Sequence, residues 1–202
     1  MRLYLVDCTP LADAKNMERA LSLLSDSRRE KAKKLCCAQK MAQSVAAGLI
    51  LTKLFGNEEI CIGEHGKPYL QNEDIHFNIS HAENWVVCAV SDCEVGLDIQ
   101  PLSPVRPAVL RRCFMLKEQE WIGNNAERFT RLWTMKEAYM KLTGTGLSVP
   151  AQEIEISLPP ATGYDSLNNC YWDFPATPIP CAICTSVEKT TELITIEIKD
   201  LL

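Results

Sequence analysis

Apolar and polar residues alternate along the first stretch of the chain and then change to a helical period. The pattern predicts a strand at residues 1–7, a helix at 13–24, and a helix starting at the Ser27-x-x-Glu30 capping-box spacing. It also predicts an apolar helix at 40–55 that Gly56-Asn57 ends. Short strands are then expected at 59–63, 75–80, 85–91 and 93–101, with a Gly-Lys-Pro turn at 66–68.

Helical spacing resumes from Val105 to about Leu142, with a break around residues 123–125. The tail returns to strands at 153–158, 170–174, 180–187 and 193–198. Each half therefore mixes helices with mostly antiparallel strands, which predicts an α+β fold in which the same arrangement occurs twice. We place the boundary so that residues 1–96 form the N-terminal half and residues 97–202 the C-terminal half.

Composition narrows the class of protein. The 202 residues are 47% hydrophobic and 23% charged, enough for one large or two small globular domains. The net charge of −5 does not suggest non-specific nucleic-acid binding, and no apolar run reaches the roughly 18 residues that a membrane span needs. We expect a soluble monomer with neither nucleic-acid nor membrane partners.

The ten cysteines are scattered through apolar runs, and no secretion signal precedes them, so a reducing cytoplasm is the expected location. Cys181 and Cys184 form a CxxC pair, but on a strand the two side chains point to opposite faces. Since no second Cys or His pair lies nearby, a zinc or redox role is not indicated.

Positive charge is concentrated near the N-terminus, where residues 1–40 hold nine basic and five acidic side chains. The basic cluster at 28–34 lies at the start of an expected helix, where it opposes the helix dipole and is best tolerated beside an anion. An exposed, solvated helix face explains the cluster equally well.

Three further features carry candidate chemistry. In the strand "VGLDIQ", Asp98 shares a face with Gly96 and Gln100, which leaves space beside the carboxylate, although a strand Asp is more often salt-bridged. Trp133, Glu137 and Lys141 form one stripe of a helix, with Lys136 on its flank; a surface ion pair is the simpler interpretation. Ser80 and His81 end a strand, and with Lys67 and the basic helix they are suited to an anion.

The order of these segments resembles the motifs of Sfp-type 4'-phosphopantetheinyl transferases. The matching stretches are "GKP" at 66–68, "FNISHA" at 77–82, "VGLDIQ" at 95–100, Phe114 with Glu118, and "WTMKEAYMK" at 133–141. The resemblance covers nearly the whole chain. It implies a pseudo-dimer of two similar α/β subdomains with the active site between them, the N-terminal half binding coenzyme A and the C-terminal half carrying the metal and the catalytic helix.

The activity implied by this resemblance is transfer of the 4'-phosphopantetheine arm of coenzyme A to a serine of an acyl or peptidyl carrier protein. The products are the holo carrier, used in fatty acid, polyketide or nonribosomal peptide synthesis, and 3',5'-ADP, and Mg²⁺ is required. Asp98, Glu137 and Lys141 are the implied catalytic residues. The implied coenzyme A contacts are Arg28, Lys31, Ser44, Lys67, Ser80, His81, Lys136 and Lys141. The implied metal ligands are Asp98, Glu137, Gln100 as a neutral carbonyl or through water, and Glu118.

Two residues depart from the family pattern. Many members have an acid where this chain has Gln100, which removes one negative charge from the metal site and predicts weaker Mg²⁺ binding. Many have Ser where this chain has Ala82, which predicts a small effect on coenzyme A affinity. The alternative function is therefore a degenerate, non-catalytic module that binds coenzyme A or a carrier protein. A P-loop phosphotransferase is disfavoured, because "TGTG" at 143–146 lacks the Lys-Ser/Thr that completes that motif.

Overall fold

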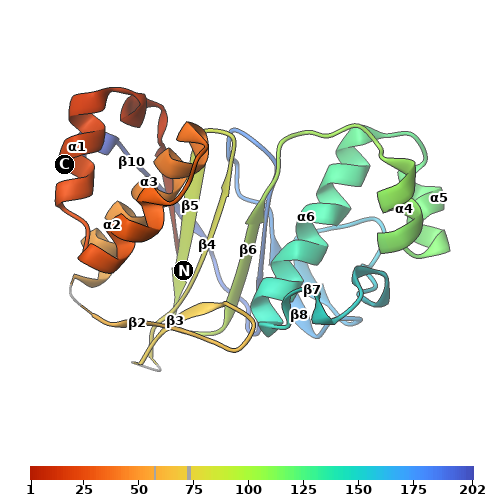
Figure 1. Ribbon diagram of the computed structural model, residues 1–202. Coiled ribbons are helices and arrows are strands. Elements are labelled where there is room, and N and C mark those ends of the chain that lie inside the picture. Colours follow the sequence, from red (N-terminus) through yellow and green to blue (C-terminus); the bar gives the residue numbers. More distant parts are fainter. Residues whose placement is uncertain (57, 72–73) are drawn as a thin grey trace.

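The computed structural model describes residues 1–56, 58–71 and 74–202. Figure 1 shows that this part of the chain forms four layers, with two groups of helices on the outside and two sheets between them. The mixture of helices and sheets confirms the predicted α+β class. Among the described residues, no helix is both long enough and apolar enough to cross a membrane.

The first sheet contains both ends of the chain. Its strands, in order across the sheet, are β10 (Glu192–Ile196), β1 (Arg2–Asp7), β5 (Trp85–Ser91) and β4 (His76–Ala82). β1 pairs parallel with β10 and antiparallel with β5. The helices of this half are η1 (Thr9–Ala12), α1 (Ala14–Ser22), α2 (Asp26–Lys33), α3 (Ala38–Phe55) and η4 (Ile198–Asp200). α3 buries most of its middle turns against the outer face of the sheet.

The second sheet is antiparallel throughout. Its strands, in order, are β6 (Val95–Ile99), β9 (Cys181–Thr185), β8 (Cys170–Asp173) and β7 (Gly163–Asp165). Its helices are α4 (Pro107–Cys113), α5 (Leu116–Ile122), α6 (Ala126–Thr143), η2 (Gly146–Ser148) and η3 (Ala151–Glu153). A separate hairpin of β2 (Ile60–Ile62) and β3 (Pro68–Leu70) lies at the lower edge of Figure 1, between the two halves.

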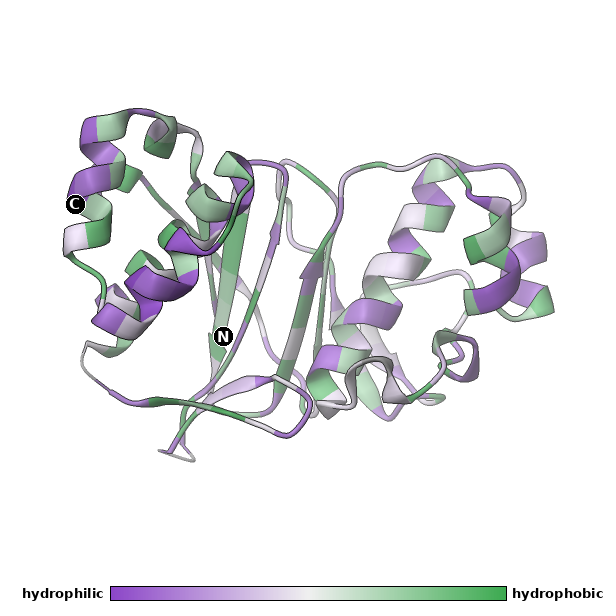
Figure 2. Cartoon of the chain, in the orientation of Figure 1, coloured by the Kyte–Doolittle hydropathy of each residue, from purple (hydrophilic) through white to green (hydrophobic). Residues whose placement is uncertain are grey.

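A shared core holds the two sheets face to face. It is built from alternate residues of strands in both sheets: Leu3 and Leu5, Val87 and Ala89, Val95, Leu97 and Ile99, and Cys181 and Ile183. Figure 2 shows the hydrophobic colour concentrated on these central strands, while the outer helices carry hydrophilic stretches. Because side chains alternate along a strand, the residues between these positions point away from the shared core, toward the helices.

The division of the chain differs from the one predicted. The boundary between residues 96 and 97 falls inside β6, which pairs along its whole length with β9. The last strand, β10, does not stay with the C-terminal half but pairs with β1 of the first sheet. The alternating pattern located most of the strands but not β3 or β7, and it contains no information about which partner a strand will find.

Two local predictions were wrong. The helix expected to start at Ser27 begins at Asp26 with Ser25 as its N-cap, so Ser27 lies inside the helix and forms no capping box. The segment at 153–158 was predicted as a strand, yet it forms a 3₁₀ turn and an extended loop. Its alternation reflects the burial of Ile154 and Ile156, while its backbone groups bond to side chains instead of to a neighbouring strand. Asn57, part of the predicted stop of the helix at 40–55, lies outside the described residues; Gly56 caps α3 with a positive φ of 61°.

Candidate active site

A close approach of helix to strand positions the site. A Cβ atom added to Gly96 on β6 would lie 2.0 Å from the carbonyl oxygen of Ala138 and 2.4 Å from the backbone nitrogen of Leu142. Only glycine therefore allows α6 to lie this close to β6. The same face of β6 carries Asp98, so the approach brings the side chains of α6 over that carboxylate.

Asp98 is the centre of a cluster of polar side chains. Its carboxylate is 3% exposed, and its Oδ1 atom accepts hydrogen bonds from Ser80 Oγ at 2.8 Å and from Lys141 Nζ at 2.6 Å. Gln100 Nε2 donates to the Oδ2 atom at 2.8 Å. Lys141 Nζ also donates to Ser80 Oγ at 3.0 Å. Residues from β4, β6 and α6, which the sequence separates by up to 61 positions, thus meet at one carboxylate.

The side chains of β4 also hold β6 in place. Asn78 Oδ1 accepts a hydrogen bond from the Leu97 N–H at 3.0 Å, and Ser80 Oγ accepts one from the Ile99 N–H at 3.4 Å. β4 and β6 run next to each other (Figure 1) but belong to different sheets. The Asn78 and Ser80 side chains therefore accept hydrogen bonds from backbone N–H groups of β6 that no backbone carbonyl of β4 accepts. Asn78 was not among the residues predicted for the site. Its place in the strand two residues before Ser80, on the same face, was the available signal.

Glu137 lies on α6 one turn before Lys141 and is half-buried. Burial and the negative charge of Asp98 raise the pKa of the Glu137 carboxyl, and Lys141 opposes the shift. Glu137 is therefore close enough to Asp98 for the two carboxylates to repel each other, and a raised pKa makes it a stronger proton acceptor. No hydrogen bond or ion pair links Glu137 to another described residue, so its oxygens are available for a substrate.

Basic side chains lie near Asp98 and Glu137. His81 follows Ser80 on β4; burial of its ring by neighbouring atoms lowers its pKa, and the charges of Lys141 and Lys40 lower it further. Lys40 lies in the first turn of α3. The Gln43 side chain donates to the Glu83 carbonyl oxygen and so anchors α3 to the β4–β5 turn. The two cations Lys40 and Lys141, the His81 imidazole and a helix N-terminus thus face one region, which suits an anion. Lys40 was not among the predicted site residues.

Lys67 connects the hairpin to the second half. Its Nζ atom donates to Glu94 Oε2 at 2.6 Å and to the Leu142 carbonyl oxygen at 3.0 Å. A cation at this carbonyl complements the negative end of the α6 dipole. Lys67 therefore contacts the C-terminal end of α6. The predicted contact of Lys67 with coenzyme A stays a prediction.

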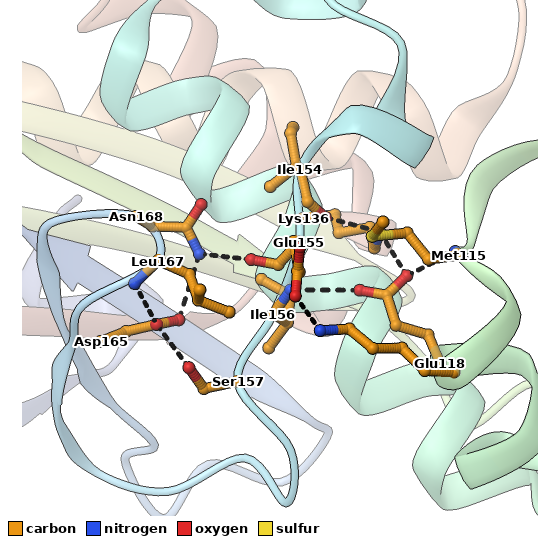
Figure 3. Close-up of polar contacts among 11 residues, drawn as sticks. Met115, Glu118, Lys136, Ile154, Glu155, Ile156, Ser157, Asp165, Leu167 and Asn168 are labelled. Carbon is orange, nitrogen blue, oxygen red and sulfur yellow. Dashed lines mark hydrogen bonds and ion pairs between the residues drawn. The ribbon is translucent and has the colours of Figure 1, made fainter.

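Lys136 and Glu118 do not reach the Asp98 cluster. Both side chains are 0% exposed, and Lys136 Nζ donates to Glu118 Oε2 at 2.7 Å and to the carbonyl oxygens of Ala151 and Ile154 (Figure 3). The other Glu118 contacts are with the backbone N–H groups of Met115 and Ile156. Every proton of the Lys136 ammonium is used inside the core, so this environment is that of a structural ion pair. The expectations that Lys136 binds coenzyme A and that Glu118 binds metal are corrected accordingly.

Arg28, Lys31 and Ser44 lie on α2 and α3. Burial lowers the pKa of the half-buried Arg28 guanidinium. None of the three side chains forms a hydrogen bond or ion pair with another residue in the described ranges. Their predicted contacts with coenzyme A stay predictions.

The cluster has the donor chemistry that a magnesium ion needs. No group of three or more His, Cys, Asp or Glu side chains able to hold a metal occurs within the described part of the chain. Asp98 and Glu137 nevertheless offer two carboxylates beside the Gln100 amide. Since Mg²⁺ keeps several waters and is commonly held by one or two carboxylates plus substrate phosphates, this set fits the ion.

Comparison with known proteins agrees with the motifs. The family model described as the 4'-phosphopantetheinyl transferase superfamily matches residues 94–189, which include β6, α6 and β9. A 4'-phosphopantetheinyl transferase of Aneurinibacillus migulanus is 41% identical over 101 residues, an alignment that covers 46% of this chain but only 42% of that protein. A 4'-phosphopantetheinyl transferase of Bacillus subtilis is 28% identical over 172 residues, 78% of this chain and 77% of the relative.

Proposed function

We propose that this chain, which is similar to 4'-phosphopantetheinyl transferases, transfers the 4'-phosphopantetheine arm of coenzyme A to a serine of an apo acyl or peptidyl carrier protein. The second product is 3',5'-ADP. The observation that supports the proposal most directly is the meeting of Asp98, Glu137 and Lys141 between the two halves, where the catalytic residues implied by the motifs were expected.

The reaction needs a base and a group that stabilises the leaving phosphate. The serine hydroxyl attacks the phosphorus next to the pantetheine arm, a new O–P bond forms, and the bond between the two phosphates breaks. In this mechanism Glu137, with its raised pKa, accepts the serine proton, directly or through a water. Lys141 donates to the diphosphate oxygen that gains negative charge as 3',5'-ADP leaves. Ser80 orients Asp98 and Lys141 through its two hydrogen bonds.

Asp98, Glu137 and the Gln100 side chain would hold Mg²⁺, which supplies positive charge to the diphosphate when bound. The amide at residue 100 contributes no negative charge, so we propose that magnesium affinity is low for such a site. A Gln100→Glu variant should reach half-maximal transfer at a lower magnesium concentration than the unaltered protein. Identical titration curves would contradict this role for Gln100.

We also propose that the chain is organised as two similar halves. Each half contains a four-stranded sheet covered by an 18-residue helix, α3 in one and α6 in the other, which supports a pseudo-dimeric arrangement with coenzyme A bound between the halves. Lys40, His81 and Lys141 are proposed to face its phosphates. All ten cysteines are free thiols, which supports a reducing, cytoplasmic location.

The function is tested by incubating the full chain with coenzyme A, Mg²⁺ and a panel of apo carrier proteins. The expected result is a mass gain of one phosphopantetheine group on at least one carrier, with an equal amount of 3',5'-ADP released. Coenzyme A binding without mass gain on any carrier would instead support the non-catalytic binding module.

A further inference from the structure

A cleft of about 650 Å³ lies in the second half, beside the N-terminal part of α6. We call it the α6 cleft. One wall is formed by α6 itself and the end of α5, and the other by the proline-rich loop at 174–180 that leads into β9. None of the site residues predicted from the sequence lines it.

Part of the α6 cleft is apolar, and the loop that forms one wall is restricted in conformation. Trp121 and Phe174 contribute aromatic rings, and Leu102 at the rim is 57% exposed. The loop contains prolines at 175, 178 and 180, which restrict its backbone, and Thr177 Oγ1 ties it together by donating to the Ile179 carbonyl oxygen at 2.8 Å. A preformed apolar surface of this kind suits an inserted hydrophobic side chain.

Two arginines add positive charge to this surface. The Arg131 guanidinium lies 4.2 Å from the centre of the Phe174 ring, and that of Arg128 lies 5.0 Å from the Trp121 ring. Arg128 also donates to the Trp121 carbonyl oxygen at 2.7 Å. Neither arginine forms an ion pair with a described carboxylate, and Glu127 is the single acidic residue of the lining as described. Held against aromatic rings, the guanidinium groups are presented to a carboxylate on a partner.

The α6 cleft adjoins the proposed site of reaction. Its floor includes Ala182, which is paired across the sheet with Asp98, and its wall includes Thr134, three residues before Glu137. Arg131, Thr134, Glu137 and Lys141 follow one another at spacings of three or four residues, so they lie along one side of α6. The cleft is at the N-terminal end of this row and Lys141 is at the other end.

That order matches the geometry of phosphoryl transfer. The attacking and leaving oxygens approach the phosphorus roughly in line, from opposite sides. If Lys141 faces the leaving diphosphate and Glu137 accepts the proton, the nucleophile must come from the side of Glu137 away from Lys141. The α6 cleft lies on that side, since its lining includes Arg131 and Thr134, which precede Glu137 on α6.

We propose that the α6 cleft binds the face of the acceptor protein that surrounds its serine, taking an apolar side chain between Trp121 and Phe174 and pairing carboxylates with Arg128 and Arg131. This inference rests on the proposed transferase function. The acceptor would then be recognised by the C-terminal half, through residues other than the cations proposed to face coenzyme A.

The test compares Arg131→Glu with Arg111→Glu, using a carrier that the unaltered full chain modifies. Arg111 is exposed on α4, does not line the cleft, and undergoes the same change of charge. Arg131→Glu should raise the KM for the carrier at least tenfold, while kcat, the Kd for coenzyme A and the melting temperature change little. Arg111→Glu should change the KM less than threefold. A carrier in which a carboxylate near the serine is replaced by lysine should restore the KM of Arg131→Glu.

Equal KM values for Arg131→Glu and Arg111→Glu would overturn the inference while leaving the transferase function intact. A rise in the Kd for coenzyme A with Arg131→Glu would also overturn it, because the cleft would then serve the other substrate. If the unaltered chain modified no carrier, the proposed transferase function itself would be contradicted. That result differs from equal KM values in two active variants, so the two failures are distinguishable.

Discussion

Lys141 Nζ lies 2.6 Å from Asp98 Oδ1, which joins the last turns of α6 to the centre of β6. The same ammonium reaches Ser80 on β4, so one side chain contacts strands of both sheets. The carboxylate is nearly buried, whereas the Lys141 side chain is 30% exposed. A partly exposed cation held beside a buried acid, at the place where two halves meet, is suited to bind an anionic group of a substrate.

Replacing Lys141 by methionine should therefore impair chemistry more than folding. We expect kcat for phosphopantetheine transfer to fall about 100-fold to 1,000-fold, the range for losing one group that stabilises developing negative charge. Lys15→Met, on the exposed face of α1, is the matched control and should keep full activity. A kcat for Lys141→Met within threefold of the unaltered protein would contradict the proposed contact with the leaving group.

Gly96→Ala should disturb both stability and activity. Its Cβ atom would overlap the Ala138 carbonyl oxygen and the Leu142 nitrogen, which are backbone atoms and cannot rotate away. We expect unfolding to become easier by about 3 kcal/mol and transfer to fall sharply, because α6 must move away from Asp98. Gly63→Ala is the control, since its nearest neighbour would be at 3.4 Å. Urea unfolding and the transfer rate measure the two effects; full activity in Gly96→Ala would refute the need for this close approach.

The Glu118–Lys136 pair should be structural (Figure 3). Lys136→Met leaves the Glu118 carboxylate buried without its cation, which should lower the free energy of unfolding by about 3–5 kcal/mol. The double variant Glu118→Gln/Lys136→Met removes both charges and should regain at least about 1 kcal/mol, measured by urea unfolding. Equal losses in the single and double variants would show that the charge pair is not the source of the effect.

Asp165 should make stability depend on acid pH. Burial would raise the pKa of this carboxyl, but hydrogen bonds from Ser157, Trp172, Asn168 and the Leu167 N–H outweigh it and hold the pKa below the ordinary value of 3.8. Figure 3 shows the contacts of Asp165 with Ser157, Leu167 and Asn168. The stabilisation is thus fully present above the unfolded pKa and is lost as the pH falls through the lower folded pKa.

The comparison is between Asp165→Asn and the unaltered chain in urea unfolding at several pH values. At pH 7 the substitution should cost about 2–3 kcal/mol, and the difference should shrink below about pH 4. Asp92→Asn is the control, because the exposed pair of Asp92 with Lys189 is screened by solvent. A difference that stays constant down to pH 3 would rule out the ionised carboxylate as the stabilising group.

Much of the site could be predicted because strand and helix periods fix which residues share a face. The alternation in "VGLDIQ" placed Gly96 and Asp98 opposite Val95 and Leu97, and the structure confirms that division. The CxxC pair behaves as predicted, with Cys181 in the core between the sheets and Cys184 in the core under α6. Both results follow from periodicity alone.

What could not be predicted depends on contacts between distant segments. Lys136 and Glu137 are neighbours in the sequence, and only the packing of α5 and the loop at 151–156 determines that Lys136 is withdrawn into the core. Asn78 acts on β6 through one tertiary hydrogen bond, and Lys40 acts on His81 from α3, a helix that is anchored to the β4–β5 turn. The sequence shows the residue types but not these distances.

We propose above all that Glu137 serves as the base in phosphopantetheine transfer. Its most direct test is single-turnover transfer from coenzyme A to an apo carrier, followed by mass gain, for the unaltered protein and Glu137→Gln. The account predicts transfer by the former and at least a 100-fold slower reaction by the latter, with unchanged melting temperature and retained coenzyme A binding. Transfer by Glu137→Gln at an unaltered rate would contradict it.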